Sequence, residues 1–133
     1  MRVVLDTSAA VGIVMRAPGW EVFEKIVAEA DRVEAPDLLI SEATNTFWKY
    51  FKMGNLSRDS CEQALERTLN LPDHFVSASE LYQEALAMAM IGQRPAYDMF
   101  FLVLARRNNA LLLSADKSLM TFAAKHDVKT LSK

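Results

Sequence analysis

The sequence predicts an α/β protein whose central parallel sheet is covered by helices on both faces. Short aliphatic runs alternate along the chain with longer segments of helical periodicity, which is the pattern of a doubly wound fold. The runs are apolar at nearly every position, as expected of strands that are buried on both sides. With 133 residues, of which 51% are hydrophobic and 24% charged, the chain is expected to form one domain over residues 1–133.

Four segments have the length and composition of strands. Each is short, aliphatic or β-branched, and bounded by turn-prone or charged residues. Because helical segments separate them, parallel pairing is expected. The four segments are RVVLD from Arg2, RVEAP from Arg32, ALLLSA from Ala110 and VKTLS from Val128.

Six longer segments place apolar side chains three and four residues apart, which is the spacing of one face of a helix. Local signals support their ends, since Ser57 is a candidate N-cap and Gly54 and Gly92 stand where two of the segments stop. The part from Asp37 to Gly92 is rich in helix, and we expect it to form a helical arm beside the sheet. The six segments are residues 20–30, 37–54, 57–72, 77–92, 95–109 and 117–127.

The composition narrows the classes of function. Lys and Arg total 15 against 17 for Asp and Glu, a formal charge of −2, so any polyanion must be bound by a local surface. Cys61 is the single cysteine, which favours the cytoplasm, and the N-terminal apolar run is too short for a signal peptide. No apolar stretch approaches the roughly 20 residues of a membrane-spanning helix, so no membrane association is expected.

Two predicted strands end on acids. Asp6 follows the first aliphatic run directly, and Asp116 follows LLLSA near the end of the chain. In an open parallel sheet the carboxyl ends of the strands share one edge, and ligands bind in the crevice where the strand order reverses. These two carboxylates, far apart in sequence, are therefore expected to meet in one crevice.

Two further acids adjoin apolar sequence. Asp98 lies in the first turn of a predicted helix whose next seven residues, 99–105, carry no charge. Glu42 shares a helical stripe with Asn45 and Lys49, opposite the apolar stripe of its own helix. Both carboxylates can therefore face the crevice that holds the strand-end acids.

Four clustered carboxylates repel one another and raise one another's pKa unless a cation holds them. Mg²⁺ or Mn²⁺ is the expected cation, since both prefer oxygen ligands and keep several waters. An ion of this kind activates water and neutralises charge at a phosphate, which is the chemistry of phosphodiester hydrolysis. The candidate catalytic and metal-binding residues are Asp6, Glu42, Asp98 and Asp116, with Thr7, Ser8, Asn45 and Ser114 as supporting residues that hold those waters.

The motifs VLDTSA, SEATN, YDMFFLVLA and LLLSADKSL, in that order across the whole chain, resemble those of PIN-domain ribonucleases of the VapC toxin type. The resemblance implies a PIN-like three-layer α/β/α fold in which the acids Asp6, Glu42, Asp98 and Asp116 form a metal site that cleaves RNA. It also implies growth inhibition, a homodimer, and a small antitoxin protein that inserts a C-terminal segment, often with an arginine, into the acidic groove. Some members carry a further acid shortly after the fourth, where this chain has Lys117, so a second metal ion is left open.

Simpler roles are open for each acid. Asp6, Asp98 and Asp116 each stand at a helix start, where an aspartate commonly acts as a cap. Glu42 could be a solvated helix charge that pairs with Lys49 or with nothing. Capping alone does not explain why all four acids fall on one expected edge of the sheet.

Other classes of function fit the motifs less well. A phosphotransferase of the haloacid dehalogenase type needs a second Asp two residues after the first, and this chain has Ser8 there. A response-regulator receiver needs an acidic pair after its first strand, where Thr7 follows Asp6. The remaining alternative is a non-catalytic PIN-like module that binds RNA or a protein. Candidate contacts for RNA phosphates are Lys49, Lys52, Arg58, Arg94, Arg106 and Lys117.

Overall fold

The computed structural model describes residues 1–131 and has the α/β architecture that the sequence predicts. A five-stranded sheet in the order β3-β2-β1-β4-β5 forms its centre, and every neighbouring pair of strands is parallel. In register, Val4 lies opposite Glu34 on one side and Leu112 on the other. The strands are β1 (Arg2–Leu5), β2 (Arg32–Pro36), β3 (His74–Val76), β4 (Leu111–Leu113) and β5 (Lys129–Thr130).

The connections between the strands are mainly helical. The helices are α1 (Thr7–Val14), α2 (Trp20–Glu29), α3 (Leu38–Lys52), α4 (Arg58–Leu69), the 3-10 helix η1 (Ala78–Glu80), α5 (Tyr82–Gly92), α6 (Ala96–Arg107) and α7 (Lys117–Ala124). Two helix ends lie where the sequence signals predict them. At the start of α4 the Ser57 hydroxyl accepts a hydrogen bond from the backbone N–H of Ser60 at 3.1 Å, and after α3 Gly54 turns the chain with a φ of 78°.

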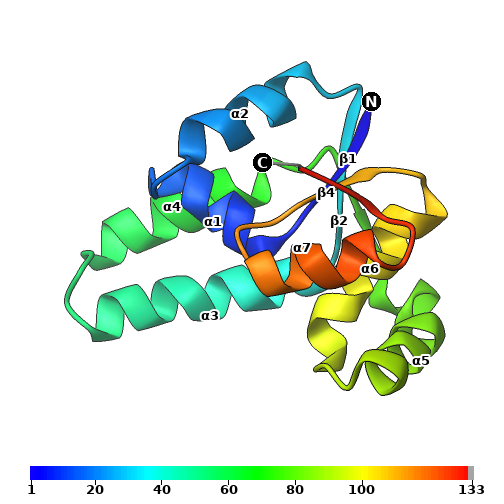
Figure 1. Ribbon diagram of the computed structural model, residues 1–133. Helices are drawn as coiled ribbons and strands as arrows, with labels where there is room; N and C mark the ends of the chain where they lie inside the picture. The colour runs from blue at the N-terminus through cyan, green and yellow to red at the C-terminus, as the bar shows by residue number, and fades with distance from the viewer. Residues whose placement is uncertain (132–133) are drawn as a thin grey trace.

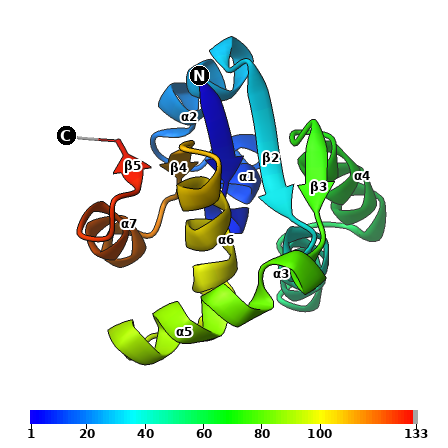
Figure 2. The same ribbon diagram turned by 90° about the vertical axis from the view of Figure 1, so that its right-hand side faces the viewer.

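Helices cover both faces of the sheet, which confirms the three-layer arrangement. α6 lies across one face, against β1, β2 and β4, and α5 packs on α6 (Figure 2). α1 and α2 lie on the opposite side of the sheet (Figure 1). Because both faces are covered, Val3, Val4 and Leu5 of β1 are all fully buried.

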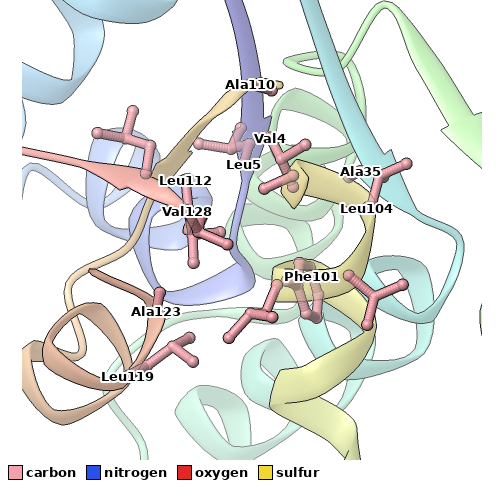
Figure 3. Close-up of a cluster of buried hydrophobic side chains, with 14 of the residues drawn as sticks. Val4, Leu5, Ala35, Phe101, Leu104, Ala110, Leu112, Leu119, Ala123 and Val128 are labelled. Carbon is pink, nitrogen blue, oxygen red and sulfur yellow. The ribbon is translucent and has the colours of Figure 1, made fainter. Parts of the chain in front are cut away.

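The main core lies between the sheet and the helices that pack on it. Phe101 and Leu104 of α6 lie among side chains of β1, β2 and β4 such as Val4 and Leu112 (Figure 3). Leu119 of α7 belongs to the same cluster. α6 is apolar over most of its length because it is buried in the middle of the molecule, and this burial fixes where its N-terminal turn lies.

The expected helical arm over residues 37–92 is present only in its first half. α3 and α4 pack side by side and project away from the sheet (Figure 1), and Phe51 near the outer end is 52% exposed. The prediction is wrong for the rest, because residues 74–76 form β3 at the sheet edge and α5 packs on α6. A three-residue edge strand is too short to show the alternation that marks a strand in sequence.

The strand expected over residues 128–132 is shorter in the structure. β5 comprises Lys129–Thr130, and residue 132 lies outside the described part of the chain. Along residues 1–131, no helix combines the length and the apolar character that crossing a membrane would require.

The strand order reverses beside β1. From β1 the chain adds β2 and β3 on one side of the sheet, and then β4 and β5 on the other. The carboxyl ends of β1 and β4 therefore meet at the switch point where open α/β sheets bind ligands. Asp6 follows β1, and the segment from Ser114 to Asp116 follows β4.

Candidate active site

A cavity of about 410 Å³ opens at the carboxyl ends of β1 and β4. All four predicted acids line it, although they come from four separate parts of the chain. Three of the four supporting residues line it as well, and Ser114 lies fully buried behind Asp6. The lining residues are Asp6, Thr7, Ser8, Val11, Glu42, Asn45, Thr46, Lys49, Asp98 and Asp116.

Asp6 is the most deeply buried of the four acids, with 7% of its surface exposed. Its Oδ2 accepts hydrogen bonds from the hydroxyls of Ser8 and Ser114, each at 2.7 Å. Asp6 occupies the N-cap position of α1 but makes no side-chain capping hydrogen bond, so the simpler capping role is wrong for this residue. Its carboxylate is instead fixed by two hydroxyl donors at the base of the cavity.

The two serines also tie the segment after β4 to the base of the cavity. The hydroxyl of Ser114 accepts a hydrogen bond from the backbone N–H of Asp116 at 3.0 Å, and the hydroxyl of Ser8 accepts one from Ala115 at the same distance. Since both hydroxyls donate to Asp6, they place Asp116 relative to Asp6.

Glu42 reaches the cavity from α3 and is held by α1. The hydroxyl of Thr7 donates to its Oε1 at 2.6 Å. No ion pair joins Glu42 to Lys49 among the described residues, so the alternative role of a charge paired with Lys49 does not apply there. Asn45 and Thr46 line the same wall, one turn further along α3.

Asp98 and Asp116 stand at the starts of α6 and α7. Asp98 lies in the first turn of α6 and faces Arg94, whose Nη2 is 3.6 Å from its Oδ2. Asp116 is the N-cap of α7, and its Oδ1 accepts a hydrogen bond from the backbone N–H of Leu119 at 3.1 Å. The capping role considered for Asp116 is therefore confirmed, and the same carboxylate lines the cavity.

The clustered carboxylates perturb one another's protonation. Burial raises the pKa of Asp6, and the charge of Asp116 raises it further. Burial also raises the pKa of Glu42 and of Asp98, and in both cases the nearby charge of Asp6 adds to the increase. The cavity therefore concentrates negative charge that the protein alone compensates only in part.

The donor set fits a hard divalent cation. Carboxylate, hydroxyl and amide oxygens are what Mg²⁺ and Mn²⁺ prefer, and a cation would relieve the repulsion among the acids. Within residues 1–131, no three acidic, imidazole or thiol groups stand close enough to hold a metal ion together. A cation in this cavity would therefore be bound directly by one or two carboxylates and reach the other acids through water.

Two features of the site were not predicted from the sequence. Val11 forms part of the cavity wall as the next turn of α1 above Thr7. Arg94, expected only as a candidate phosphate contact, pairs with Asp98 instead. The spacing of four residues between this arginine and the acid is a signal that could have indicated the pair.

Fold and site together define a class, a doubly wound α/β protein with an acidic cavity at its topological switch point. The family follows from comparison with known sequences, because the profile of the PIN domain matches residues 3–125. The chain belongs to the PIN-domain family.

Similar proteins agree with this assignment. Ribonuclease VapC3 of Pyrobaculum aerophilum is 28% identical over 123 residues, which is 90% of this chain and 92% of that protein. The crystal structure of PAE2754 from Pyrobaculum aerophilum superposes with a TM-score of 0.76 at 17% identity, covering 98% of this chain and 83% of that one. VapBC2 from Rickettsia felis, bound to a DNA fragment from their promoter, gives 0.69 at 13% identity, covering 98% of each chain. FitAcB from Neisseria gonorrhoeae gives 0.66 at 15% identity, covering 98% of this chain and 96% of that one.

Proposed function

We propose that this protein is a metal-dependent endoribonuclease that acts as the toxin of a toxin–antitoxin pair. One observation carries the proposal: four carboxylates, from the end of β1, from α3, from the first turn of α6 and from the N-cap of α7, converge on one cavity. Burial and mutual repulsion raise the pKa of three of them. A site so charged is costly for a protein unless it holds a cation. Membership of the PIN-domain family and the similarity to a VapC ribonuclease support RNA as the substrate.

The catalytic residues are Asp6, Glu42, Asp98 and Asp116, which would hold Mg²⁺ or Mn²⁺ directly or through water. When bound, such an ion supplies a lowered pKa for the attacking water and neutralises charge on the phosphate. The protein contributes orientation. Ser8 and Ser114 fix the carboxylate of Asp6, and Thr7 fixes that of Glu42. Asn45, on the cavity wall beside Glu42, can donate to a water or a phosphate oxygen from its amide.

RNA binding is the second requirement, and the net charge of −2 does not provide it. Lys49 lines the cavity, so a phosphate that enters it meets positive charge on α3. Nζ of Lys52 lies instead over the ring of Trp48, 5.0 Å from its centre. Arg106 and Arg107 form ion pairs with Glu84 of α5 and do not line the cavity. An RNA substrate and the single buried Cys61 are consistent with action in the cytoplasm.

Two apolar surfaces suit the partners that we propose, a second copy of the chain and an antitoxin. Tyr82, Leu86 and Met90 form a row along α5, and each is more than half exposed, which supports self-association through this helix. A groove of about 390 Å³ between α3 and α4, lined in part by Trp48 and Phe51, can take an apolar segment of the antitoxin. The groove lies along α3, the helix that also carries Glu42.

The experiment is cleavage of a labelled structured RNA by the purified protein, with MgCl₂, with MnCl₂ and with EDTA. We expect cleavage with either ion and none with EDTA. Asp116→Asn keeps a good helix cap but removes a ligand charge, so we expect it to lower the cleavage rate about a hundredfold or more. Asp59→Asn, at an exposed position in the first turn of α4, is the matched control and should cleave normally.

The same preparations separate the alternative function. If the wild-type protein binds RNA tightly but never cleaves it with either ion, the protein is a binding module and the proposed activity is wrong. If Asp116→Asn cleaves as fast as wild type, the assignment of the acids is wrong. Induced expression adds the biological role, because growth should stop with wild type and continue with Asp116→Asn.

A further inference from the structure

The loop between α5 and α6 carries Arg94, whose backbone and side chain both make defined contacts. α5 ends at Gly92, and Gln93 then adopts a left-handed conformation with a φ of 52°. This turn directs the backbone N–H of Arg94 to the carbonyl of Ala89 at 3.1 Å. The side chain of Arg94 is only 19% exposed, although it begins in a surface loop. The guanidinium is thus drawn into the molecule next to the candidate active site.

The guanidinium of Arg94 bridges two helices. Its Nη1 donates a hydrogen bond to the hydroxyl of Ser118 in the first turn of α7, at 2.8 Å. Its Nη2 lies 3.6 Å from Oδ2 of Asp98 in the first turn of α6. α6 and α7 pack little against each other directly, so Arg94 is a tie between the helix starts that carry Asp98 and Asp116.

An aromatic ring supports this bridge from below. The guanidinium carbon of Arg94 is 5.6 Å from the centre of the Phe122 ring, within the range of a cation–π contact. Gly92 makes room for the ring, because a Cβ there would lie 2.5 Å from its edge atoms. The end of α5 and the face of α7 therefore fit around one arginine.

One nitrogen of the Arg94 guanidinium has no hydrogen-bond partner within residues 1–131. Among the buried side-chain nitrogen and oxygen atoms of the described residues, Nε of Arg94 is the one without a hydrogen-bond partner. Leaving a buried donor unsatisfied is unfavourable, and such atoms in native structures call for an explanation. The contacts of the two Nη atoms have set the position of the guanidinium, at the expense of Nε.

We propose that Arg94 is a positioning residue of the active site, which sets the carboxylate of Asp98 relative to Asp116 by bridging Asp98 to Ser118. The inference rests on the proposed function and names a part of that site which the four acidic motifs do not contain. The ion pair is longer than a hydrogen bond, so Asp98 is oriented by Arg94 but keeps its oxygens available to the cavity.

A direct contact with RNA is the competing role for this arginine. It is disfavoured because Arg94 does not line the cavity and both of its Nη groups already have partners. The two roles differ in kinetics. A positioning residue acts on the catalytic step and lowers kcat, whereas a phosphate contact acts on binding, raises KM and adds to the salt dependence.

The first test is calorimetry of Mn²⁺ binding to the metal-free protein. Ser118→Ala leaves every charge in place and removes only the acceptor of the bridge, so any effect on the ion comes from positioning. We expect Mn²⁺ to bind about threefold to tenfold more weakly, the scale of one charge-assisted hydrogen bond at a partly exposed site. Thr121→Ala, which removes an exposed hydroxyl from the same helix, is the matched control and should bind like wild type.

The second test is RNA cleavage by Arg94→Ala and Arg94→Lys. We expect Arg94→Ala to lower kcat about tenfold or more with little change in KM, and Arg94→Lys to restore only part of it, because an ammonium lacks the planar fork that reaches both partners. The proposal is overturned if Ser118→Ala matches wild type in Mn²⁺ binding and Arg94→Lys restores kcat fully. A raised KM with unchanged kcat in Arg94→Ala also overturns it, in favour of RNA contact. A wild-type protein that neither binds Mn²⁺ nor cleaves RNA overturns the proposed function as well.

Discussion

Replacing Asp6 by Asn should stabilise the metal-free protein while it destroys the site. Asp6 is 7% exposed and shares its cavity with three other carboxylates. The amide oxygen of Asn can accept the same hydrogen bonds from Ser8 and Ser114, so the substitution removes a charge and keeps most of the packing. The sign of the effect is unusual, since most substitutions of buried residues are destabilising.

The magnitude follows from the charges around Asp6. A like charge across a partly hydrated cavity contributes on the order of 0.5–1 kcal/mol of repulsion, so relief from two or three neighbours amounts to about 1–2 kcal/mol. For a domain of this size we expect the melting temperature in EDTA at neutral pH to rise by about 3–8 °C. With millimolar MgCl₂ the difference should shrink or reverse, because on the proposed function the ion would stabilise wild type and the variant would lack one of its ligands.

The pH dependence of this gain has a definite direction. Burial raises the pKa of Asp6 in the folded protein, so the folded state retains that proton to higher pH than the unfolded chain does. The destabilisation is therefore absent below the ordinary carboxyl range and grows as the pH rises through the raised pKa. Asp6→Asn should gain more over wild type at neutral pH than at mildly acidic pH.

The assay is thermal unfolding followed by circular dichroism, in EDTA and in MgCl₂, at both pH values. Asp59→Asn serves as the control, since its exposed carboxylate lies outside the cavity and its loss should leave stability unchanged or slightly lower. An Asp6→Asn protein that melts below wild type in EDTA at neutral pH would refute the argument that burial and repulsion make the charge of Asp6 unfavourable.

Two further substitutions test the framework of the site. Ser114→Ala should lower the free energy of unfolding by about 1–3 kcal/mol, because the partly buried N–H of Asp116 loses its acceptor and Asp6 loses a donor. Urea unfolding measures this change, and an unchanged free energy would show that water replaces the hydroxyl. Glu34→Ala should cost about 2–3 kcal/mol, the scale of a charge-assisted hydrogen bond, through the loss of bonds from Arg2 at 2.6 Å and Asn108 at 3.1 Å. Its RNA cleavage below the melting temperature should equal that of wild type, since Glu34 does not line the cavity.

The sequence predicted the parts of the fold that have strong local patterns. The strand before Asp6 and the strand before Ser114 are continuous apolar runs, and their burial on both faces is what such runs indicate. β3 was missed because its three residues pair with β2 through backbone hydrogen bonds that leave no trace in residue type. The expected extent of the helical arm, residues 37–92, was wrong for the same reason.

The sequence was enough to predict which acids form the candidate site. It was not enough to predict the contacts that hold those acids in place. Strand ends and helix starts follow from local pattern, so Asp6, Asp98 and Asp116 could be placed at one edge before the structure was known. The bridge from Arg94 to Ser118 depends on how closely α7 approaches the end of α5. That distance is set by tertiary packing of Gly92 against Phe122, for which a single sequence carries no signal.

Asp116 serves both the site and the fold with one side chain. Its Oδ1 holds the first turn of α7 through the N–H of Leu119, and its carboxylate also faces the cavity. Fraying of that single turn would withdraw one acid while the sheet stayed intact. The active site can therefore be disrupted by a local opening far smaller than global unfolding. A partner that stabilises or unfolds the first turn of α7 would then change the activity without contacting the other three acids.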